Sequence, residues 1–297
     1  MIVGVIGLGS MGLGAAQSLL RAGIKTWGCD VNPQACEAFS KAGGTVSDDP
    51  AAMAASCDVI AVFVVSIAQV RTVLFESGAV KAARNGTVFL ISATISPTDA
   101  EMIGERLARA GMLMIDGPVS GGAAKAASGE MTIMASGSQE AFNTAQPAID
   151  AISSHVFRLG DTIGAGSRMK LVNQHLAGVH IAATAEAMTQ AIAMGMNPHE
   201  VINVISACAG TSWMFENRAP HIADGDYMPR SAIEIWLKDL NIVLGAASQS
   251  GMDPVLARTA LSQFQKAADA GLSREDDAAV AKVYARNAGL KLPGEDA

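Results

Sequence analysis

The first 160 residues alternate short apolar runs with longer amphipathic ones. Continuous apolar runs are typical of strands buried on both faces of a sheet, and their alternation with helical segments predicts a doubly wound, mostly parallel sheet. The predicted strands read IVGVIG, KTWGCD, DVIAVFVV, GTVFLIS, MLMID, EMTIMASG and HVFRLG. The predicted helices between them cover residues 11–21, 33–41, 67–75 and 97–110, and a further helix begins near Gln139.

After Gly166 the strand-like runs stop and apolar residues recur at helical spacing. We expect helices near residues 167–195, 199–208, 231–249, 255–270 and 276–286. The predicted fold class is therefore an α/β N-terminal domain, residues 1–162, followed by an all-α C-terminal domain, residues 163–297, with a long interdomain helix between them. Ligands commonly bind between domains, so the candidate site is expected there.

Composition excludes several classes of protein. The 297 residues are 50% hydrophobic and 16% charged, with a formal net charge of −7. The sequence has no block of five or more basic residues, so a nucleic-acid-binding surface is not expected. No apolar run reaches the ~18 residues of a membrane helix. The chain opens on a strand-like segment without a leader pattern, so we expect a cytoplasmic protein with no nucleic-acid or membrane partner. The cysteines at 29, 36, 57 and 208 lack metal or redox spacing, and we expect no metal.

The segment VIGLGSMGLG carries a G-x-G-x-x-G pattern directly after a predicted strand and at the start of a predicted helix. This context predicts a Rossmann dinucleotide-binding loop, in which backbone N–H groups at a helix N-terminus approach a pyrophosphate. Asp30 follows at the end of the second strand, where a carboxylate accepts hydrogen bonds from ribose hydroxyls and repels a 2′-phosphate, so the expected cofactor is NAD. The alternative is a glycine-rich turn and a helix-capping acid without a ligand. The candidate cofactor contacts in the loop are Gly7, Leu8, Gly9, Ser10, Met11 and Gly12.

A lysine near the start of the long apolar helix is the candidate catalytic group. Asn173 and Gln174 lie three and four residues after Lys170, on the same helix face, and that face continues as Ala177 and Ile181. A buried ammonium needs a partner, or its pKa falls. The alternative is a lysine that extends from the helix end into solvent.

Two further segments are ambiguous when considered alone. Ser120, Gly121 and Gly122 follow the strand MLMID and could present a hydroxyl and two N–H groups to a carboxylate, but S-G-G is also an ordinary loop. Lys238 could be a site residue, or it could form an exposed charge pair with its neighbour in the sequence KDL. The acidic pair in SREDDAAV is interpreted as the start of the last helix.

Taken together, these segments resemble the β-hydroxyacid dehydrogenase family. Its four landmarks occur in order as GLGSMG, DGPVSGG, GAGSRMKLVNQ and KDLNIV, and the resemblance covers essentially the whole chain. The resemblance implies that the loop at Ser120, Gly121 and Gly122 binds a substrate carboxylate and that Lys170 is the general acid/base. It also implies that Thr94 and Lys238 lie against the cofactor and that Val64 and Val65 lie beside the adenine ribose. Either Asn173 or Gln174 orients the substrate.

The resemblance also implies a reaction. A neutral Lys170 would take the hydroxyl proton as hydride passes to the nicotinamide, and burial, the positive nicotinamide and Lys238 would lower its pKa from the ordinary value of about 10.4. The whole-chain pattern is most similar to the branch that oxidises the C2 hydroxyl of L-threonate.

Three alternatives remain. The chain could oxidise 3-hydroxyisobutyrate or reduce a semialdehyde such as tartronate semialdehyde, it could reduce imines, or it could bind a dinucleotide without catalysis. The long helix is apolar on most faces, so we also expect a homodimer or homotetramer built mostly through the helical domain.

Overall fold

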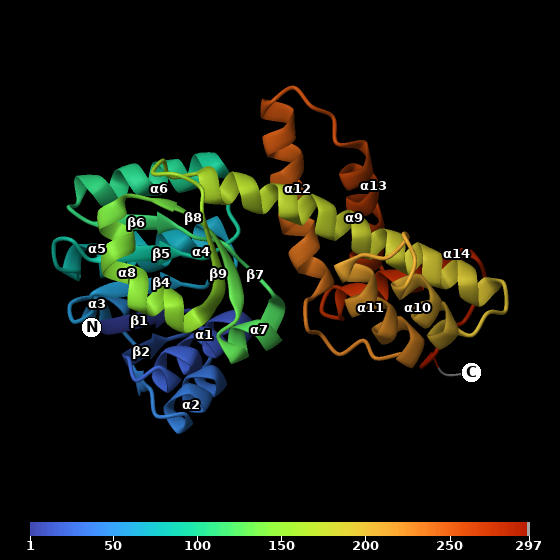
Figure 1. Ribbon diagram of the computed structural model, residues 1–297, viewed down its shortest axis with the longest axis horizontal. Helices are drawn as coiled ribbons and strands as arrows, with labels where there is room; N and C mark the ends of the chain where they lie inside the picture. Colours follow the sequence, from blue (N-terminus) through green and yellow to red (C-terminus); the bar gives the residue numbers. More distant parts are fainter. Residues whose placement is uncertain (296–297) are drawn as a thin grey trace. The chain divides into compact units, whose positions relative to one another are not determined.

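The computed structural model describes residues 1–295 of the chain. It divides into two compact units, Met1–Lys170 and a second unit that begins at Leu171. The first unit contains the sheet and the second is built from helices, which confirms the predicted fold class (Figure 1).

One sheet runs through the first unit. Its strands are β1 (Ile2–Ile6), β2 (Lys25–Cys29), β3 (Thr45–Val46), β4 (Val59–Val62), β5 (Val88–Ile91), β6 (Leu113–Asp116), β7 (Val119–Ser120), β8 (Met131–Gly137) and β9 (Ser153–Arg158). They are ordered β3-β2-β1-β4-β5-β6-β8-β7, and β9 also pairs with β8. The strands from β3 to β6 are parallel, whereas β8 runs antiparallel to β6 and β7. The carboxyl ends of β1, β2, β4, β5 and β6 therefore share one edge.

Both faces of the sheet are covered because alternate side chains of each strand enter different cores. Val59 and Ala61 of β4 belong to one apolar cluster, and Ile60 and Val62 belong to the other. The first cluster is completed by α1 (Ser10–Arg21), α2 (Pro33–Lys41), α7 (Gly122–Ser128) and α8 (Gln139–Ile152). The second is completed by α3 (Pro50–Ala54), α4 (Ile67–Arg71), the π-helix η1 (Thr72–Glu76), α5 (Ala79–Ala82) and α6 (Pro97–Arg109).

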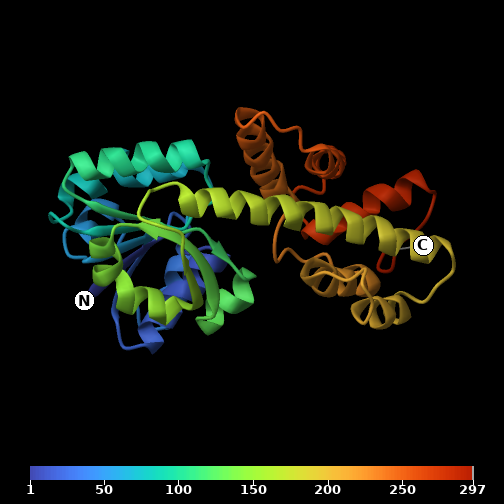
Figure 2. The same cartoon turned by 45° about the horizontal axis from the view of Figure 1, so that its top comes forward.

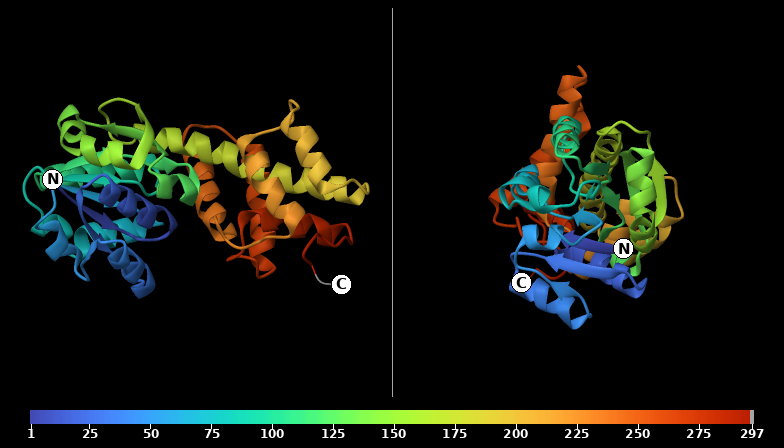
Figure 3. Two further views of the ribbon diagram at one scale, coloured as in Figure 1. Left: turned by 60° about the horizontal axis from the view of Figure 1, so that its bottom comes forward. Right: turned by 90° about the vertical axis from the view of Figure 1, so that its left-hand side faces the viewer.

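The long helix α9 (Ala165–Ala193) is continuous through the point at which the two units divide (Figure 2). The other helices of the second unit are α10 (Pro198–Ser206), α11 (Trp213–Asp224), α12 (Ile233–Gln249), α13 (Val255–Asp269), the 3₁₀ helix η2 (Asp277–Val280) and α14 (Ala281–Asn287), seen from two sides in Figure 3. Ile181, Leu240 and Phe264 lie at the centre of their shared core. A Cβ added at Gly178 of α9 would lie 2.8 Å from Cδ2 of Leu240, so these two helices pack closely.

Helix α11 is absent from the sequence-based expectations, which place no helix between residues 209 and 230. Its sequence contains Pro220, which removes one backbone donor inside the helix. The helix forms because Ser212 caps its start by accepting a hydrogen bond from the N–H of Phe215, and because Arg218 on its buried face forms an ion pair.

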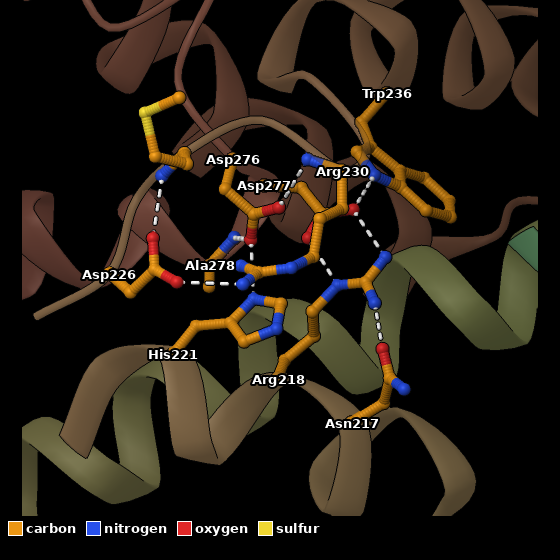
Figure 4. Close-up of polar contacts among 10 residues, drawn as sticks. Asn217, Arg218, His221, Asp226, Arg230, Trp236, Asp276, Asp277 and Ala278 are labelled. Atoms are coloured by element: carbon orange, nitrogen blue, oxygen red, sulfur yellow. Dashed lines mark hydrogen bonds and ion pairs between the residues drawn. The ribbon is translucent and has the colours of Figure 1, made fainter. Parts of the chain in front are cut away.

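That ion pair belongs to a buried polar network in the second unit (Figure 4). Arg218 donates from Nε and Nη2 to the two carboxylate oxygens of Asp277, at 2.5 and 3.0 Å, and Trp236 of α12 donates to the same carboxylate at 2.8 Å. Asp276 interacts with Nδ1 of His221 at 2.9 Å and accepts the N–H of Arg230 at 3.0 Å. The network joins α11, the start of α12 and η2, so it holds the helix that carries Lys238.

The two acidic residues were expected only to begin the last helix, and this interpretation is incomplete. Asp276 does accept the N–H of Ala278 in η2, but both carboxylates are 0% exposed and are paired with groups from other helices. Buried carboxylates in this position act as tertiary cross-links, which a local acidic pattern does not reveal.

Among the described residues no helix is both long enough and apolar enough to cross a membrane. The four cysteines are unpaired, with Cys29 and Cys57 buried. Burial is the main cause that raises the pKa of the Cys29 thiol to about 11.

Candidate functional site

The glycine loop joins β1 to α1 at the carboxyl edge of the sheet. Gly7 has a φ of +90°, which favours glycine. A Cβ added at Gly12 would lie 1.8 Å from the carbonyl oxygen of Gly7, so only glycine lets the first turn of α1 approach the loop. A Cβ added at Gly9 would meet no atom within 4 Å, and Gly9 is exposed directly before the N-terminus of α1. These features fit a dinucleotide pyrophosphate at the helix N-terminus.

Asp30 lies against this loop. Its Oδ2 accepts the N–H of Leu8 at 2.5 Å and its Oδ1 accepts the N–H of Asn32 at 2.7 Å. The carboxylate therefore sits where β1 and β2 end, and the structure brings it together with the glycine loop as expected. Leu8 is buried, Met11 is half-buried and Ser10 is exposed.

Three more predicted cofactor contacts follow neighbouring strands at the same edge. Val64 and Val65 follow β4 after one intervening residue, and Thr94 comes three residues after the end of β5. A Cβ added at Gly7 would lie 3.1 Å from the backbone nitrogen of Val64, which makes the two loops immediate neighbours. Val65 is 54% exposed, so its side chain is available to a ligand.

Lys170 is buried in α9, with only 7% of the residue exposed. Its Nζ donates a hydrogen bond of 2.8 Å to the carbonyl oxygen of Val119. The alternative in which this lysine extends into solvent is therefore wrong. Val119 directly precedes Ser120, so the ammonium lies beside the S-G-G loop.

The S-G-G loop has a backbone that needs its glycines. Gly121 has a φ of +129° and Gly122 a φ of +71°, and Gly122 begins α7. Ser120 and Gly121 are half-buried and Gly122 is exposed. The loop and Lys170 thus form one group of candidate residues within the first unit.

A second group lies in the helical unit and is centred on Asp239. Gln174 donates from Nε2 to Oδ2 of Asp239 at 2.5 Å, and Lys238 forms an ion pair with Oδ1 of the same carboxylate at 2.6 Å. Asn173 donates from Nδ2 to Oε1 of Gln174 at 2.9 Å. The chain of contacts therefore connects Asn173 to Lys238 through two buried side chains.

The alternative in which Lys238 forms an exposed charge pair is also wrong, because Asp239 is only 2% exposed. Asp239 is a residue that sequence reasoning missed as part of the site. The signal in the sequence was the position of Asp239 next to the candidate cofactor lysine, because a buried carboxylate there needs partners of its own. The partner, Gln174, lies 65 residues away, and only the fold reveals it.

Asp116 is a second residue that sequence reasoning missed. It ends β6, is 0% exposed and accepts hydrogen bonds from Gly164 and Ser167 at the start of α9. Burial raises the pKa of the Asp116 carboxyl, and the hydrogen bonds from Ser167, Gly164 and Ser136 oppose that rise. No group of three His, Cys, Asp or Glu side chains suited to a metal ion occurs among residues 1–295.

Two family models together cover most of the chain. Residues 2–160 match the NAD binding domain of 6-phosphogluconate dehydrogenase, and residues 164–284 match the NAD-binding domain of NADP-dependent 3-hydroxyisobutyrate dehydrogenase.

Similar proteins extend this match over the full length. L-threonate dehydrogenase of Cupriavidus necator is 49% identical over 99% of this chain and 98% of its own, and that of Escherichia coli (strain K12) is 48% identical over 98% and 96%. A crystal structure described as 3-hydroxyisobutyrate dehydrogenase from Salmonella typhimurium is 47% identical, with a TM-score of 0.91 over 95% of this chain and 99% of that one. The chain therefore belongs to the 3-hydroxyisobutyrate dehydrogenase-type family of β-hydroxyacid dehydrogenases, which are NAD(P)-dependent oxidoreductases that act on CH–OH groups.

Proposed function

We propose that this protein is an NAD-linked dehydrogenase that oxidises the C2 hydroxyl of L-threonate to the 2-oxo acid 2-dehydro-L-erythronate, with Lys170 as general acid/base. The observation that carries the chemistry is the buried Lys170 Nζ, hydrogen-bonded 2.8 Å from the carbonyl oxygen of Val119, next to Ser120. The substrate is supported by the full-length identity of 48–49% to proteins named L-threonate dehydrogenase.

NAD is favoured over NADP by Asp30. Its carboxylate accepts the N–H of Leu8 in the glycine loop, at the position where ribose hydroxyls are recognised in this type of loop. A 2′-phosphate would meet this negative charge directly. The residues of the first unit that would hold the cofactor are the glycine loop, Asp30, Val64, Val65 and Thr94.

When bound, NAD supplies the hydride acceptor for the carbon that is oxidised. Lys170 in its neutral form takes the proton of the substrate hydroxyl, and it returns a proton in the reverse reaction. Ser120 and the N–H groups of Gly121 and Gly122 bind the carboxylate, which fixes the distance from that anchor to the reacting hydroxyl.

Asn173 is the amide that contacts the substrate in this proposal. Both ends of the Gln174 amide are engaged, Oε1 with Asn173 and Nε2 with Asp239, whereas Asn173 uses only its Nδ2 in that contact. The carbonyl end of Asn173 is thereby oriented and can accept a substrate hydroxyl. Gln174 then acts as the support of Asn173 and Asp239.

We further propose a homodimer or homotetramer. Val172 and Leu176, four residues apart on α9, are 59% and 53% exposed, which is a high apolar exposure on one helix face. Light scattering tests this part: a particle of the monomer mass, 30.4 kDa, would contradict it.

A panel of acids tests the function. Formation of NADH from NAD, or of NADPH from NADP, is measured with L-threonate, D-threonate, erythronate, glycerate and 3-hydroxyisobutyrate. The proposal predicts the highest kcat/KM for L-threonate with NAD. The second candidate is 3-hydroxyisobutyrate, favoured by the name of the Salmonella typhimurium structure; its preference in the panel would overturn the substrate but keep the chemistry. No oxidation of any acid would overturn the function.

A further inference from the structure

The carboxylate of Asp116 makes all of its described hydrogen bonds to two places, the start of α9 and the neighbouring strand β8. Its Oδ2 accepts the N–H groups of Gly164 and Ser167 at 3.0 and 2.8 Å, and its Oδ1 accepts the hydroxyl of Ser167 at 2.7 Å. Ser136 of β8 donates to Oδ2 at 3.5 Å. The first N–H groups of a helix have no partner inside it, and here a carboxylate 51 residues earlier in the chain satisfies them.

The backbone of α9 also approaches the sheet unusually closely at this point. A Cβ added at Gly166 would lie 2.4 Å from the carbonyl oxygens of both Asp116 and Met134. The N–H of Gly166 in turn donates to the hydroxyl of Ser136 at 3.2 Å. Any side chain at Gly166 must displace the helix start from β6 and β8, so the close approach is a second, independent constraint on its position.

Both constraints act on the turn directly before Lys170. Ser167 lies three residues before Lys170 in the same helix, and Val119, which accepts the lysine hydrogen bond, lies three residues after Asp116. The carboxylate of Asp116, at the end of β6, thus holds the helical turn that precedes Lys170. The segment that follows β6 carries Val119 and Ser120. All of these residues lie in the first unit.

We propose that Asp116 is a positioning residue that fixes Lys170 relative to the Ser120 loop by binding the first turn of α9. This inference rests on the proposed function, because it takes Lys170 to be the general acid/base. Loss of the carboxylate frees the helix start, and the lysine then shifts relative to a substrate anchored at Ser120. A displacement of about an ångström is enough to slow a positioned proton transfer by about 10²-fold.

Three substitutions separate geometry from charge. Asp116→Ala removes both carboxylate oxygens that accept hydrogen bonds at the helix start. Asp116→Asn keeps the shape: its Oδ1 can accept both N–H groups, while its Nδ2 donates to the Ser167 hydroxyl, which can also be an acceptor. Gly166→Ala displaces the same turn while leaving the carboxylate in place.

Asp58→Ala is the matched control. The carboxylate of Asp58 also binds a backbone group of the first unit: it accepts the N–H of Ile2 at 2.8 Å, and it pairs with Arg84 at 2.6 Å. It precedes β4, at the amino edge of the sheet, whereas the candidate site lies at the carboxyl edge. It therefore reports the effect of losing a structural carboxylate far from Lys170.

The test measures kcat for L-threonate oxidation per NAD-binding molecule, and the primary isotope effect on kcat with substrate deuterated at C2. We expect Asp116→Ala to lower kcat by about 10²-fold with an unchanged Kd for NAD and a larger isotope effect, because chemistry becomes rate-limiting. Asp116→Asn recovers most of kcat, Gly166→Ala behaves as Asp116→Ala, and Asp58→Ala keeps the wild-type values. A merely structural role would lower the fraction of folded protein but leave the isotope effect unchanged.

Wild-type kcat per NAD-binding molecule in Asp116→Ala, or an equal loss in Asp58→Ala, would overturn the inference. A Lys170→Met variant, measured in parallel, distinguishes a failure of this inference from a failure of the proposed function. If Lys170→Met is inactive while Asp116→Ala is not impaired, only the positioning role fails. If Lys170→Met keeps turnover, the general acid/base role of Lys170 fails, and if the wild type oxidises no acid, the proposed function itself fails.

Discussion

Gln174 and Asp239, 65 residues apart in the chain, share a hydrogen bond of 2.5 Å from Nε2 to Oδ2, and they are only 7% and 2% exposed. The bond ties α9 to α12 within the helical unit. Asp239 also pairs with Lys238, and Gln174 also accepts a hydrogen bond from Asn173. One buried carboxylate therefore organises all three candidate site residues of that unit.

This relationship predicts different defects for the two neighbouring amides. Gln174→Met leaves the buried Oδ2 of Asp239 without its donor, and an unsatisfied buried group costs about 1–3 kcal/mol, so thermal stability and activity both fall. Asn173→Ala removes a half-buried amide that the proposal assigns to the substrate, so kcat/KM falls while the unfolding midpoint stays near the wild type. Steady-state kinetics and thermal unfolding of both variants make the comparison. Equal loss of stability in both variants would contradict the assignment.

Asp30 predicts cofactor choice. Asp30→Asn keeps an oxygen that can accept the N–H of Leu8 but removes the charge that would face a 2′-phosphate. Like charges in contact cost several kcal/mol, so we expect the NAD-to-NADP ratio of kcat/KM to fall by about 10²-fold.

The matched control for this charge change is Asp48→Asn. Asp48 is exposed and lies shortly after β3, so its removal changes the net charge equally while the Asp30 carboxylate that contacts the glycine loop stays in place. Kinetics with both cofactors are compared for wild type and the two variants. A ratio that is unchanged in Asp30→Asn, or reduced equally in Asp48→Asn, would show that Asp30 does not select the cofactor.

The polar network of the helical unit predicts a pH-dependent contribution to stability. Burial alone would raise the pKa of Asp276, but hydrogen bonds from His221, Arg230 and Ala278 outweigh it and hold the pKa below its ordinary value. The stabilisation from this carboxylate is therefore fully present above the unfolded pKa of about 3.9 and is lost as the pH falls through the lower folded value.

Asp276→Asn tests that dependence. We expect the variant to unfold at lower denaturant concentration than the wild type at neutral pH. The difference should shrink below about pH 4, because the Asp276 carboxylate protonates first in the unfolded chain and then, at the lower folded pKa, in the native protein. Asp269→Asn, at the exposed end of α13, is the control and should change stability by no more than about 0.5 kcal/mol. A difference between wild type and Asp276→Asn that does not change with pH would refute this role.

Local signals were sufficient to predict the glycine loop and seven of the nine described strands, but not the two-residue strands β3 and β7. Continuous apolar runs predicted β1, β4 and β5. The glycines of VIGLGSMG predicted the loop, because a bound dinucleotide needs a tight turn, a close backbone approach and a helix start. The start of α9 and the burial of Lys170 were also predictable, because the helix face that contains Lys170 continues into apolar residues.

Long-range contacts explain what the sequence did not reveal. Helix α11 contains Pro220 and depends on the ion pair between Arg218 and Asp277, which lie 59 residues apart. Asp116 and Asp239 have ordinary local sequence environments, and their importance comes from distant partners on α9. A buried carboxylate is recognised only when the fold shows which donors surround it.

The most direct test of the account is the rate of NADH formation from L-threonate by the wild type and by Lys170→Met. The substitution keeps the apolar stem but removes the amine, so we expect NAD to bind with wild-type affinity while kcat falls by about 10²–10⁴-fold, the range for a general acid/base. A Lys170→Met enzyme that oxidises L-threonate at the wild-type rate would contradict the central claim.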